Sequence, residues 1–199
     1  MSEKSTNKYA IVDLEATSAS STACIIQGGI VIMQNGRVID EFASDVNPHQ
    51  KLDNHIVHLT GITDQQLSQA PDFSEIARTI FELIEDCIFV AHNVKFDANL
   101  LAEALFMEGF ELRTPRVDTV ELAQVFYPTL EQYNLSYLSR VLNLDLAQAH
   151  TAIEDARATG KLLLHLMDKI ASLPRQTIEM LLTFSDNLLF ETELVIRDA

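Results

Sequence analysis

The chain has 199 residues, of which 47% are hydrophobic and 22% are charged, a composition that excludes a disordered chain and predicts one domain with a single core. Its 14 Lys and Arg residues against 29 Asp and Glu residues give a net charge of −15, which argues against broad electrostatic capture of a nucleic acid. The two cysteines are too few for a disulfide scaffold or a Cys-based zinc site.

The chain also lacks the sequence signals of an exported or membrane protein. Residues 1–8 are polar and contain no apolar run of the kind found in signal peptides. No uninterrupted apolar stretch approaches the ~20 residues that a membrane-spanning helix needs. We therefore expect a soluble protein of a reducing compartment, most simply the cytoplasm, with no membrane partner.

Short apolar runs predict the strands of a mixed α/β sheet. The pair Asn35-Gly36 lies between two such runs and predicts a hairpin, so the strands on either side of it should be antiparallel. Later runs alternate with helical patterns, which indicates a sheet with helices packed on it. The strands are expected over residues 9–14, 24–33, 38–46, 87–91 and 116–119.

Apolar residues spaced three and four apart predict the helices between these strands. The stretch up to Asp86 is expected to contain several helical pieces, and Gly109 is expected to end the helix that follows the fourth strand. The longer helices are expected up to about residue 107 and over residues 120–126, 135–142 and 152–170.

Pro174 is a plausible boundary, which would divide the chain into a domain over residues 1–173 and a helical extension or linker over residues 174–199. A further helical stripe follows this proline, and the apolar run from Leu194 to Ile196 suggests either a surface for a partner or an end produced by truncation. The stripe consists of Ile178, Leu181, Leu182, Ser185, Leu188 and Leu189.

The informative acids are those that fall on apolar faces. Asp13 and Glu15 are two residues apart at the end of the first strand, so both side chains project to one face of the sheet. Ligands bind open α/β sheets at the carboxyl ends of the strands. The pair is equally compatible with a polar strand end that meets a loop.

Two further acids stand at the beginning of helical core stripes. Asp97 shares the inward face of its helix with Leu101 and Leu105, although an acid in a first helical turn is also favoured by the helix dipole. Asp155 precedes the stripe of Thr159, Leu162, Leu163, Leu166 and Ile170.

The residues around Asp155 have ordinary structural explanations. Thr151 and Glu154 match a capping box, which accounts for Glu154 without any catalysis. His150 precedes the cap, and a lone histidine is more often structural or exposed than catalytic. The capping box does not account for Asp155. Four carboxylates from three segments are hard to bury unpaired, and divalent cations with oxygen ligands would resolve their repulsion.

Three segments resemble the ordered motifs of DnaQ-like, DEDDh-type 3′–5′ exonucleases. They are Asp13-Leu-Glu15-Ala-Thr17, His92-Asn-Val-Lys-Phe-Asp97 and His150-Thr-Ala-Ile-Glu-Asp155. The resemblance covers about residues 8–170 and includes 58–63 and Asp118-Thr119. The family often has Thr-Thr-Gly where this chain has Ala16-Thr17-Ser18, a departure that concerns substrate fit and not the carboxylates.

The resemblance implies a ribonuclease H-like fold, with a mixed five-stranded sheet and helices on both faces. It also implies hydrolysis of phosphodiester bonds from the 3′ end of single-stranded DNA or RNA, with release of nucleoside 5′-monophosphates. By resemblance, two Mg²⁺ or Mn²⁺ ions would be held by Asp13, Glu15, Asp97 and Asp155.

The resemblance assigns roles to several other side chains as well. His150 would be the general base, and Thr17 and Thr60 are weaker candidates for contacting the terminal nucleotide. His92 and Asn93 are expected to shape a strand-to-helix turn. A structural role for Thr17 and Thr60 is an equal alternative.

Residues 173–178 and the helix after them are similar to the segment that follows the nuclease in bacterial DinG-type proteins, where a helicase-like region comes next. No Walker-type phosphate-binding motif is present in the sequence, so any ATPase would lie beyond Ala199 or be absent. A stand-alone exonuclease or a polymerase proofreading subunit are alternatives. Rival functions are a non-catalytic interaction module with this fold and an oligonucleotide exonuclease that prefers RNA.

Overall fold

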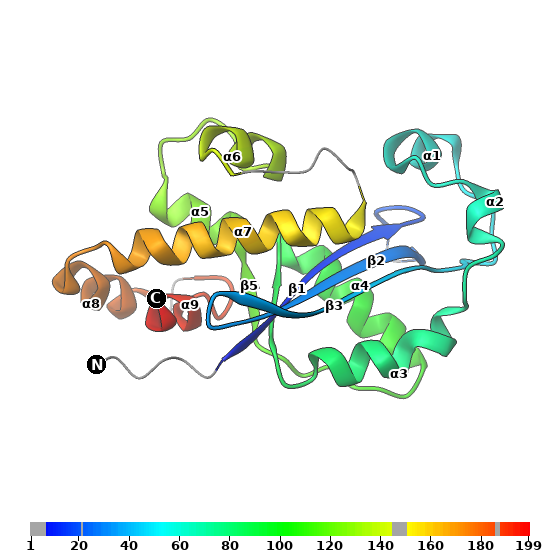
Figure 1. Cartoon of the computed structure of the whole chain (residues 1–199), viewed down its shortest axis with the longest axis horizontal. Coiled ribbons are helices and arrows are strands. Elements are labelled where there is room, and N and C mark those ends of the chain that lie inside the picture. The colour runs from blue at the N-terminus through cyan, green and yellow to red at the C-terminus, as the bar shows by residue number, and fades with distance from the viewer. Residues whose placement is uncertain (1–6, 21, 145–150, 186–187) are drawn as a thin grey trace.

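The computed structural model describes residues 7–20, 22–144, 151–185 and 188–199. Its strands form one five-stranded sheet in the order β3-β2-β1-β4-β5. The first three strands are antiparallel neighbours, and β4 and β5 run parallel to β1 (Figure 1). The bounds are β1 Lys8–Ala16, β2 Ile25–Gln34, β3 Arg37–Asp45, β4 Ile88–Ala91 and β5 Arg116–Asp118.

The hairpin between β2 and β3 forms where the sequence predicts it. Asn35 and Gly36 both have positive φ angles, of 52° and 72°. A two-residue turn with both central residues in this region has the twist that joins antiparallel strands without splaying them. The hairpin therefore sets the register of β2 against β3.

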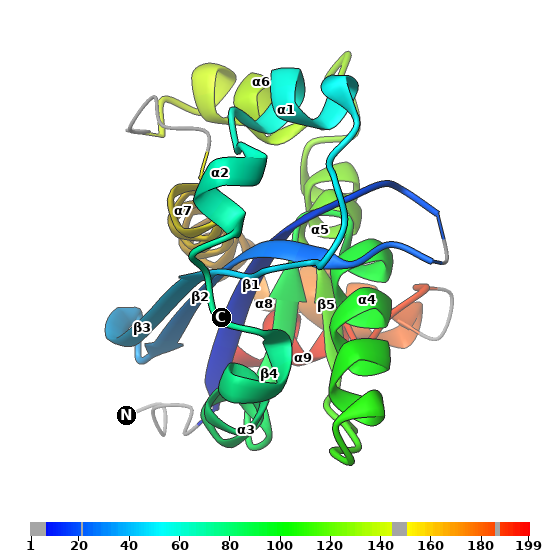
Figure 2. The same ribbon diagram turned by 90° about the vertical axis from the view of Figure 1, so that its right-hand side faces the viewer.

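Helices cover both faces of the sheet, as predicted (Figures 1 and 2). Helix α7 lies along one face together with α5 and α6, whereas α3 and α4 pack on the other. The helices before the C-terminal segment are α1 Asn54–Thr60, α2 Asp64–Leu67, α3 Phe73–Ile84, α4 Val94–Met107, α5 Thr119–Phe126, α6 Leu135–Val141 and α7 Ala152–Ala171.

The side chains of β1 point alternately to the two faces of the sheet and contribute to the apolar core on each face. Tyr9 and Ile11 belong to the apolar cluster beneath α7, whereas Ala10 and Val12 belong to the cluster beneath α3 and α4. All four are less than a tenth exposed. This strand is packed on both faces before its carboxyl end. The packing therefore supports the side chains that follow it.

The C-terminal segment differs from the sequence-based expectation in two respects. Helix α8 (Arg175–Thr183) ends before the predicted stripe does, and Leu189 is 83% exposed. The apolar run at the end of the chain is not an open partner surface, because Val195 and Ile196 in α9 (Glu193–Asp198) are 0% and 3% exposed. Both belong to the core cluster on the α7 side of the sheet.

Long-range hydrogen bonds hold this segment against the sheet. The Glu191 N–H donates to the Arg116 carbonyl at 3.0 Å, and the Glu191 carboxylate accepts from the Arg116 N–H at 2.9 Å. Glu191 therefore satisfies backbone groups of the edge strand β5. At the beginning of β1, the Tyr9 hydroxyl and the Asn7 amide donate to Asp198.

The proposed boundary at residue 174 stays a prediction. Among the described residues, no helix has the length and apolar character needed to span a bilayer.

Because side chains of α9 are buried in the core, we expect this helix to contribute to the stability of the fold. We expect Ile196→Ala to lower the free energy of unfolding by about 2–5 kcal/mol, because it removes a buried side chain and leaves a cavity. Met180→Ala in α8, where the side chain is 56% exposed, is the control and should change it by less than about 0.5 kcal/mol. Urea unfolding measures both variants, and equal stability of the two would contradict the assignment of α9 to the core.

Candidate metal centre

Asp13 and Glu15 lie at the carboxyl end of β1 and project to the face that α7 covers. Across the β1–β2 ladder, Asp13 is paired with Gly29 and Glu15 with Gln27. Directly paired residues and residues two apart on a strand share one face. These four side-chain positions therefore form one patch beneath the first turn of α7. Figure 1 shows the carboxyl end of β1 and the beginning of α7 at the same end of the molecule.

Gly29 allows the backbone of α7 to lie directly on β2. A Cβ atom at this position would stand 2.3 Å from the Ala152 carbonyl carbon and 2.3 Å from the Ile153 nitrogen. No side chain other than hydrogen fits such an approach. The contact brings the first turn of α7, and Asp155 with it, beside Asp13 and Glu15.

The first turn of α7 is capped differently from the sequence-based prediction. The Thr151 side chain makes no capping hydrogen bond, so the capping box predicted with Glu154 is wrong. Glu154 instead forms an ion pair with Arg157, which also donates from Nε to Glu41 at 3.0 Å. The Ala152 N–H is bonded by a residue distant in sequence, since it donates to Gln27 Oε1 at 2.9 Å.

Asp13, Glu15 and Asp155 are brought together as the sequence predicts. Each offers one carboxylate oxygen, and these oxygens all lie within 4.8 Å of one another. All three residues are partly buried. One cation placed among them would be within reach of three oxygen ligands, the donor type that hard divalent metals take in proteins.

Asp97 joins this cluster from the other side of the sheet. It lies in the first turn of α4, is 6% exposed, and its Oδ1 accepts the backbone N–H of Leu14 at 2.9 Å. Leu14 is the residue between Asp13 and Glu15, so this hydrogen bond fixes Asp97 relative to both acids. Burial raises the pKa of Asp97 to about 7, and the negative charges of Glu15 and Asp118 act in the same direction.

The electrostatics of the cluster fit a bound cation. Burial raises the pKa of Asp13 well above its usual range, and the charges of Asp97, Asp155 and Glu15 raise it further. Without a counter-charge, each ionised carboxylate disfavours ionisation of the others. A divalent cation bound among them would favour the ionised forms of all of them. The four predicted ligands therefore form an acidic cluster whose donor set suits a divalent metal.

The turn before α4 is built as the sequence predicts. Asn93 has φ 75° and ψ 57°, the left-handed conformation that asparagine tolerates better than most residues. Its N–H donates to Asp118 Oδ1 at 3.0 Å, and the ring of His92 is hydrogen-bonded to Thr119 Oγ1 and the Tyr133 carbonyl oxygen. Burial lowers the pKa of His92. His92 and Asn93 thus shape this turn through contacts to β5 and α5.

The other predicted site residues are placed as follows. His150 lies outside the described residues. The Thr17 hydroxyl accepts from the Cys24 N–H at 3.0 Å and closes the β1–β2 loop, and the Thr60 hydroxyl donates to the Ile56 carbonyl at 2.9 Å near the end of α1. Both hydroxyls therefore have structural roles, and their contact with a nucleotide stays a prediction.

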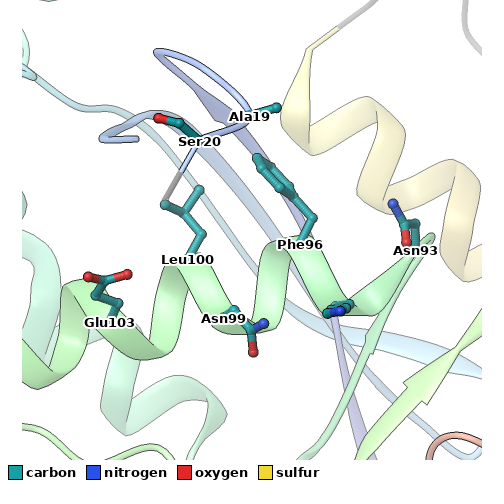
Figure 3. Close-up of a pocket in the computed structure, with 8 residues that line it drawn as sticks. Ala19, Ser20, Asn93, Phe96, Asn99, Leu100 and Glu103 are labelled. Carbon is teal, nitrogen blue, oxygen red and sulfur yellow. The ribbon is translucent and has the colours of Figure 1, made fainter. Parts of the chain in front are cut away.

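A cavity of about 450 Å³ lies between α4 and the β1–β2 loop. Figure 3 shows Phe96 and Leu100 pointing from α4 toward the part of the loop that carries Ala19 and Ser20. Phe96 is the residue immediately before Asp97. The described residues that line the cavity are Ala19, Ser20, Asn93, Lys95, Phe96, Asn99, Leu100 and Glu103.

Gln27 and Gly29 are site residues that the sequence reasoning missed. Both lie inside the apolar run of β2, where a polar amide and a glycine are each unusual. A glycine within a strand often marks a close backbone approach, and that signal was available at Gly29. The partner of Gln27 is 125 residues away, so no local pattern points to it.

The sequence matches the family described as "Exonuclease" over residues 10–163, and the chain belongs to that family. The predicted resemblance to an exonuclease family is thereby confirmed, and the solved structures described below confirm the predicted fold. The acidic cluster at the carboxyl end of β1 accordingly lies in a domain of the exonuclease family, and the prediction of an exonuclease is confirmed at the level of the family.

Curated relatives include the "3'-5' exonuclease DinG" of Staphylococcus aureus strain USA300, which is 38% identical over 185 residues. The match covers 92% of this chain but only 21% of the relative, so the chain spans about a fifth of that protein's length. The DinG proteins of other Staphylococcus aureus strains, such as NCTC 8325, match equally well, at 38% identity.

Solved structures with the same fold include the nuclease domain of 3'hExo, described as a DEDDh family member bound to rAMP. Its TM-score is 0.72 at 16% identity, and the alignment covers 87% of this chain and 98% of that one. Exonuclease X in complex with 5' overhanging duplex DNA has a TM-score of 0.67 at 19% identity, with 83% and 94% covered.

The contact at Gly29 predicts that alanine substitutions at two adjacent glycines differ greatly in their effect on stability. We expect Gly29→Ala to destabilise the protein by at least about 3 kcal/mol, because the new Cβ collides with the backbone of α7. Gly28→Ala is the matched control, since its Cβ meets only the flexible end of Leu14, at 3.3 Å. It should stay within about 1 kcal/mol of the wild type in thermal unfolding. Equal effects of the two substitutions would show that α7 does not lie on β2 as described.

Proposed function

We propose that this chain is a DEDDh-type 3′–5′ exonuclease that depends on two divalent ions, Mg²⁺ or Mn²⁺. The observation that carries the proposal is the convergence of Asp13, Glu15 and Asp155 within one ion's reach, with Asp97 hydrogen-bonded to the backbone of Leu14 next to the first two. These four residues would hold the ions. When bound, two such cations stabilise the attacking and leaving oxygens of an in-line displacement at phosphorus.

The protein's own groups would position the ligands and move the proton. The Leu14 N–H holds Asp97 in place, and the buried β1 strand holds Asp13 and Glu15. We assign to His150 the role of general base, which accepts a proton from the attacking water. An unperturbed imidazole, with a pKa of ~6.5, is suited to that task near neutral pH. The products would be nucleoside 5′-monophosphates.

The cavity between α4 and the β1–β2 loop is the proposed place for the 3′-terminal nucleotide, because Phe96 in its lining immediately precedes Asp97. Phe96 offers an aromatic face on which a base could stack, and Lys95 is the one cationic side chain among the described residues that line the cavity. Thr17 and Thr60 are further candidates for contacts with this nucleotide. Recognition by stacking and by the metal site, with few phosphate contacts, accords with a net charge of −15 and favours single-stranded ends.

The proposed partners follow from the DinG relatives, of which this chain matches about a fifth. We propose that the exonuclease acts together with a helicase-like domain carboxyl-terminal to it, in the cytoplasm, a polymerase being the alternative partner. A tethered domain raises the local concentration of the nucleic acid. It would therefore supply affinity that an acidic nuclease domain lacks.

The activity is tested with a 5′-labelled single-stranded DNA in the presence of Mg²⁺ or Mn²⁺. We expect a ladder that shortens from the 3′ end and disappears when EDTA removes the metal. Asp97→Asn should lower the rate at least about a hundredfold, because it removes a buried charge from the metal site while preserving the shape of the side chain.

The matched control is Glu85→Gln, which removes one exposed charge away from the cluster and should leave the rate unchanged. The same assay on RNA of equal sequence decides between a DNA-preferring and an RNA-preferring enzyme. No shortening of either nucleic acid with either metal would contradict the proposal and favour a non-catalytic module with this fold.

A further inference from the structure

The beginning of α7 depends on an acceptor from outside the helix. The first N–H groups of a helix have no partners within it, and a side chain at the N-cap position commonly supplies one. Thr151, at that position, makes no such bond. The Ala152 N–H donates instead to Gln27 Oε1 at 2.9 Å, so a side chain of β2 is the anchor of this helix end.

The amide of Gln27 is held in one orientation by its second hydrogen bond. Its Nε2 donates to Asp45 Oδ1 at 2.7 Å, and the other oxygen of Asp45 accepts from Gln66 Nε2 at 2.8 Å. A carboxylate can only accept, so the nitrogen of the amide must face Asp45 and its oxygen must face Ala152. The chain of hydrogen bonds thus connects α2, β3 and β2 to the first turn of α7.

The position of this anchor relates it to the metal cluster. Gln27 lies directly opposite Glu15, and Gly29 lies directly opposite Asp13. Gly29 sets how closely α7 approaches the sheet, while the Gln27 amide fixes the end of α7 on it. Two of the three described acids in the cluster lie in β1, and the third, Asp155, lies in α7. Asp155 is three residues beyond Ala152.

We propose that Gln27 is a positioning residue for the metal site, which acts through the first turn of α7 to hold Asp155 beside Asp13 and Glu15. The inference rests on the proposed metal-dependent function. Without the Gln27 hydrogen bond, the beginning of α7 loses an anchor and Asp155 samples positions farther from the other two acids. The expected consequence is weaker metal binding. Once the metal site is saturated, the binding of the nucleic acid should match that of the wild type.

The test measures the dissociation constant for Mn²⁺ by isothermal titration calorimetry, without nucleic acid, on the full chain. Gln27→Met keeps the length of the side chain but can neither donate nor accept these hydrogen bonds. We expect it to weaken Mn²⁺ binding about tenfold, as loss of a supporting partner of a metal ligand typically does. In activity assays it should raise the Mn²⁺ concentration for half-maximal rate and, at saturating Mn²⁺, leave the KM for the oligonucleotide unchanged.

Two controls separate positioning from general stability. Gln65→Ala removes an exposed amide next to Gln66 and should bind Mn²⁺ like the wild type. Ile196→Ala destabilises the core through α9 and should also keep the wild-type affinity at a temperature where it is folded. Weakening by Ile196→Ala equal to that by Gln27→Met would overturn the inference.

Wild-type Mn²⁺ affinity in Gln27→Met overturns the inference and leaves the proposed function intact. Absence of Mn²⁺ binding in the wild type overturns the proposed function itself. If Gln27→Met does not fold, Asp45→Ala is measured in its place, because it removes the group that orients the amide. The same tenfold weakening is expected there, and an unchanged affinity would again overturn the inference.

Discussion

Carboxylates repel one another, and three of them lie within 4.8 Å at the carboxyl end of β1, with a fourth hydrogen-bonded to the backbone of Leu14 beside them. Burial first, and then the neighbouring negative charges, raise the pKa values of Asp13 and Asp97, so keeping these acids ionised costs free energy unless a cation is present. The surrounding structure is what prevents the acids from separating. A strand buried on both faces carries two of them, and helices packed on opposite faces carry the others.

The contacts that enforce this arrangement are made mostly by the backbone. The Leu14 N–H fixes Asp97, the missing side chain of Gly29 admits α7, and the Ala152 N–H is bonded to Gln27. Backbone groups within a sheet and at a helix end move little, so they hold the ligands more firmly than flexible side chains could. Preorganised ligands are what metal-dependent hydrolysis requires, because an ion must be held in one place while bonds at phosphorus change.

Much of this architecture could be predicted from local patterns. The hairpin followed from Asn35-Gly36, and the pairing of Asp13 with Glu15 on one face followed from the period of a strand. Asp97 was placed correctly because its helix carries a continuous apolar stripe. The failures all involved partners far away in the sequence. Gln27 displaced the predicted cap at Thr151, and contacts with β5 and β1 drew the C-terminal segment into the core, where the sequence had suggested an exposed surface.

The four carboxylates are proposed to form a site for divalent metal, and Mn²⁺ can be located directly by its anomalous scattering. Crystals of the chain soaked in Mn²⁺ should show anomalous peaks among Asp13, Glu15 and Asp155, with Asp97 adjoining. We expect Asp97→Asn crystals to lose or weaken these peaks. Mn²⁺ bound only at other surface acids, with none among these four residues, would contradict the proposal.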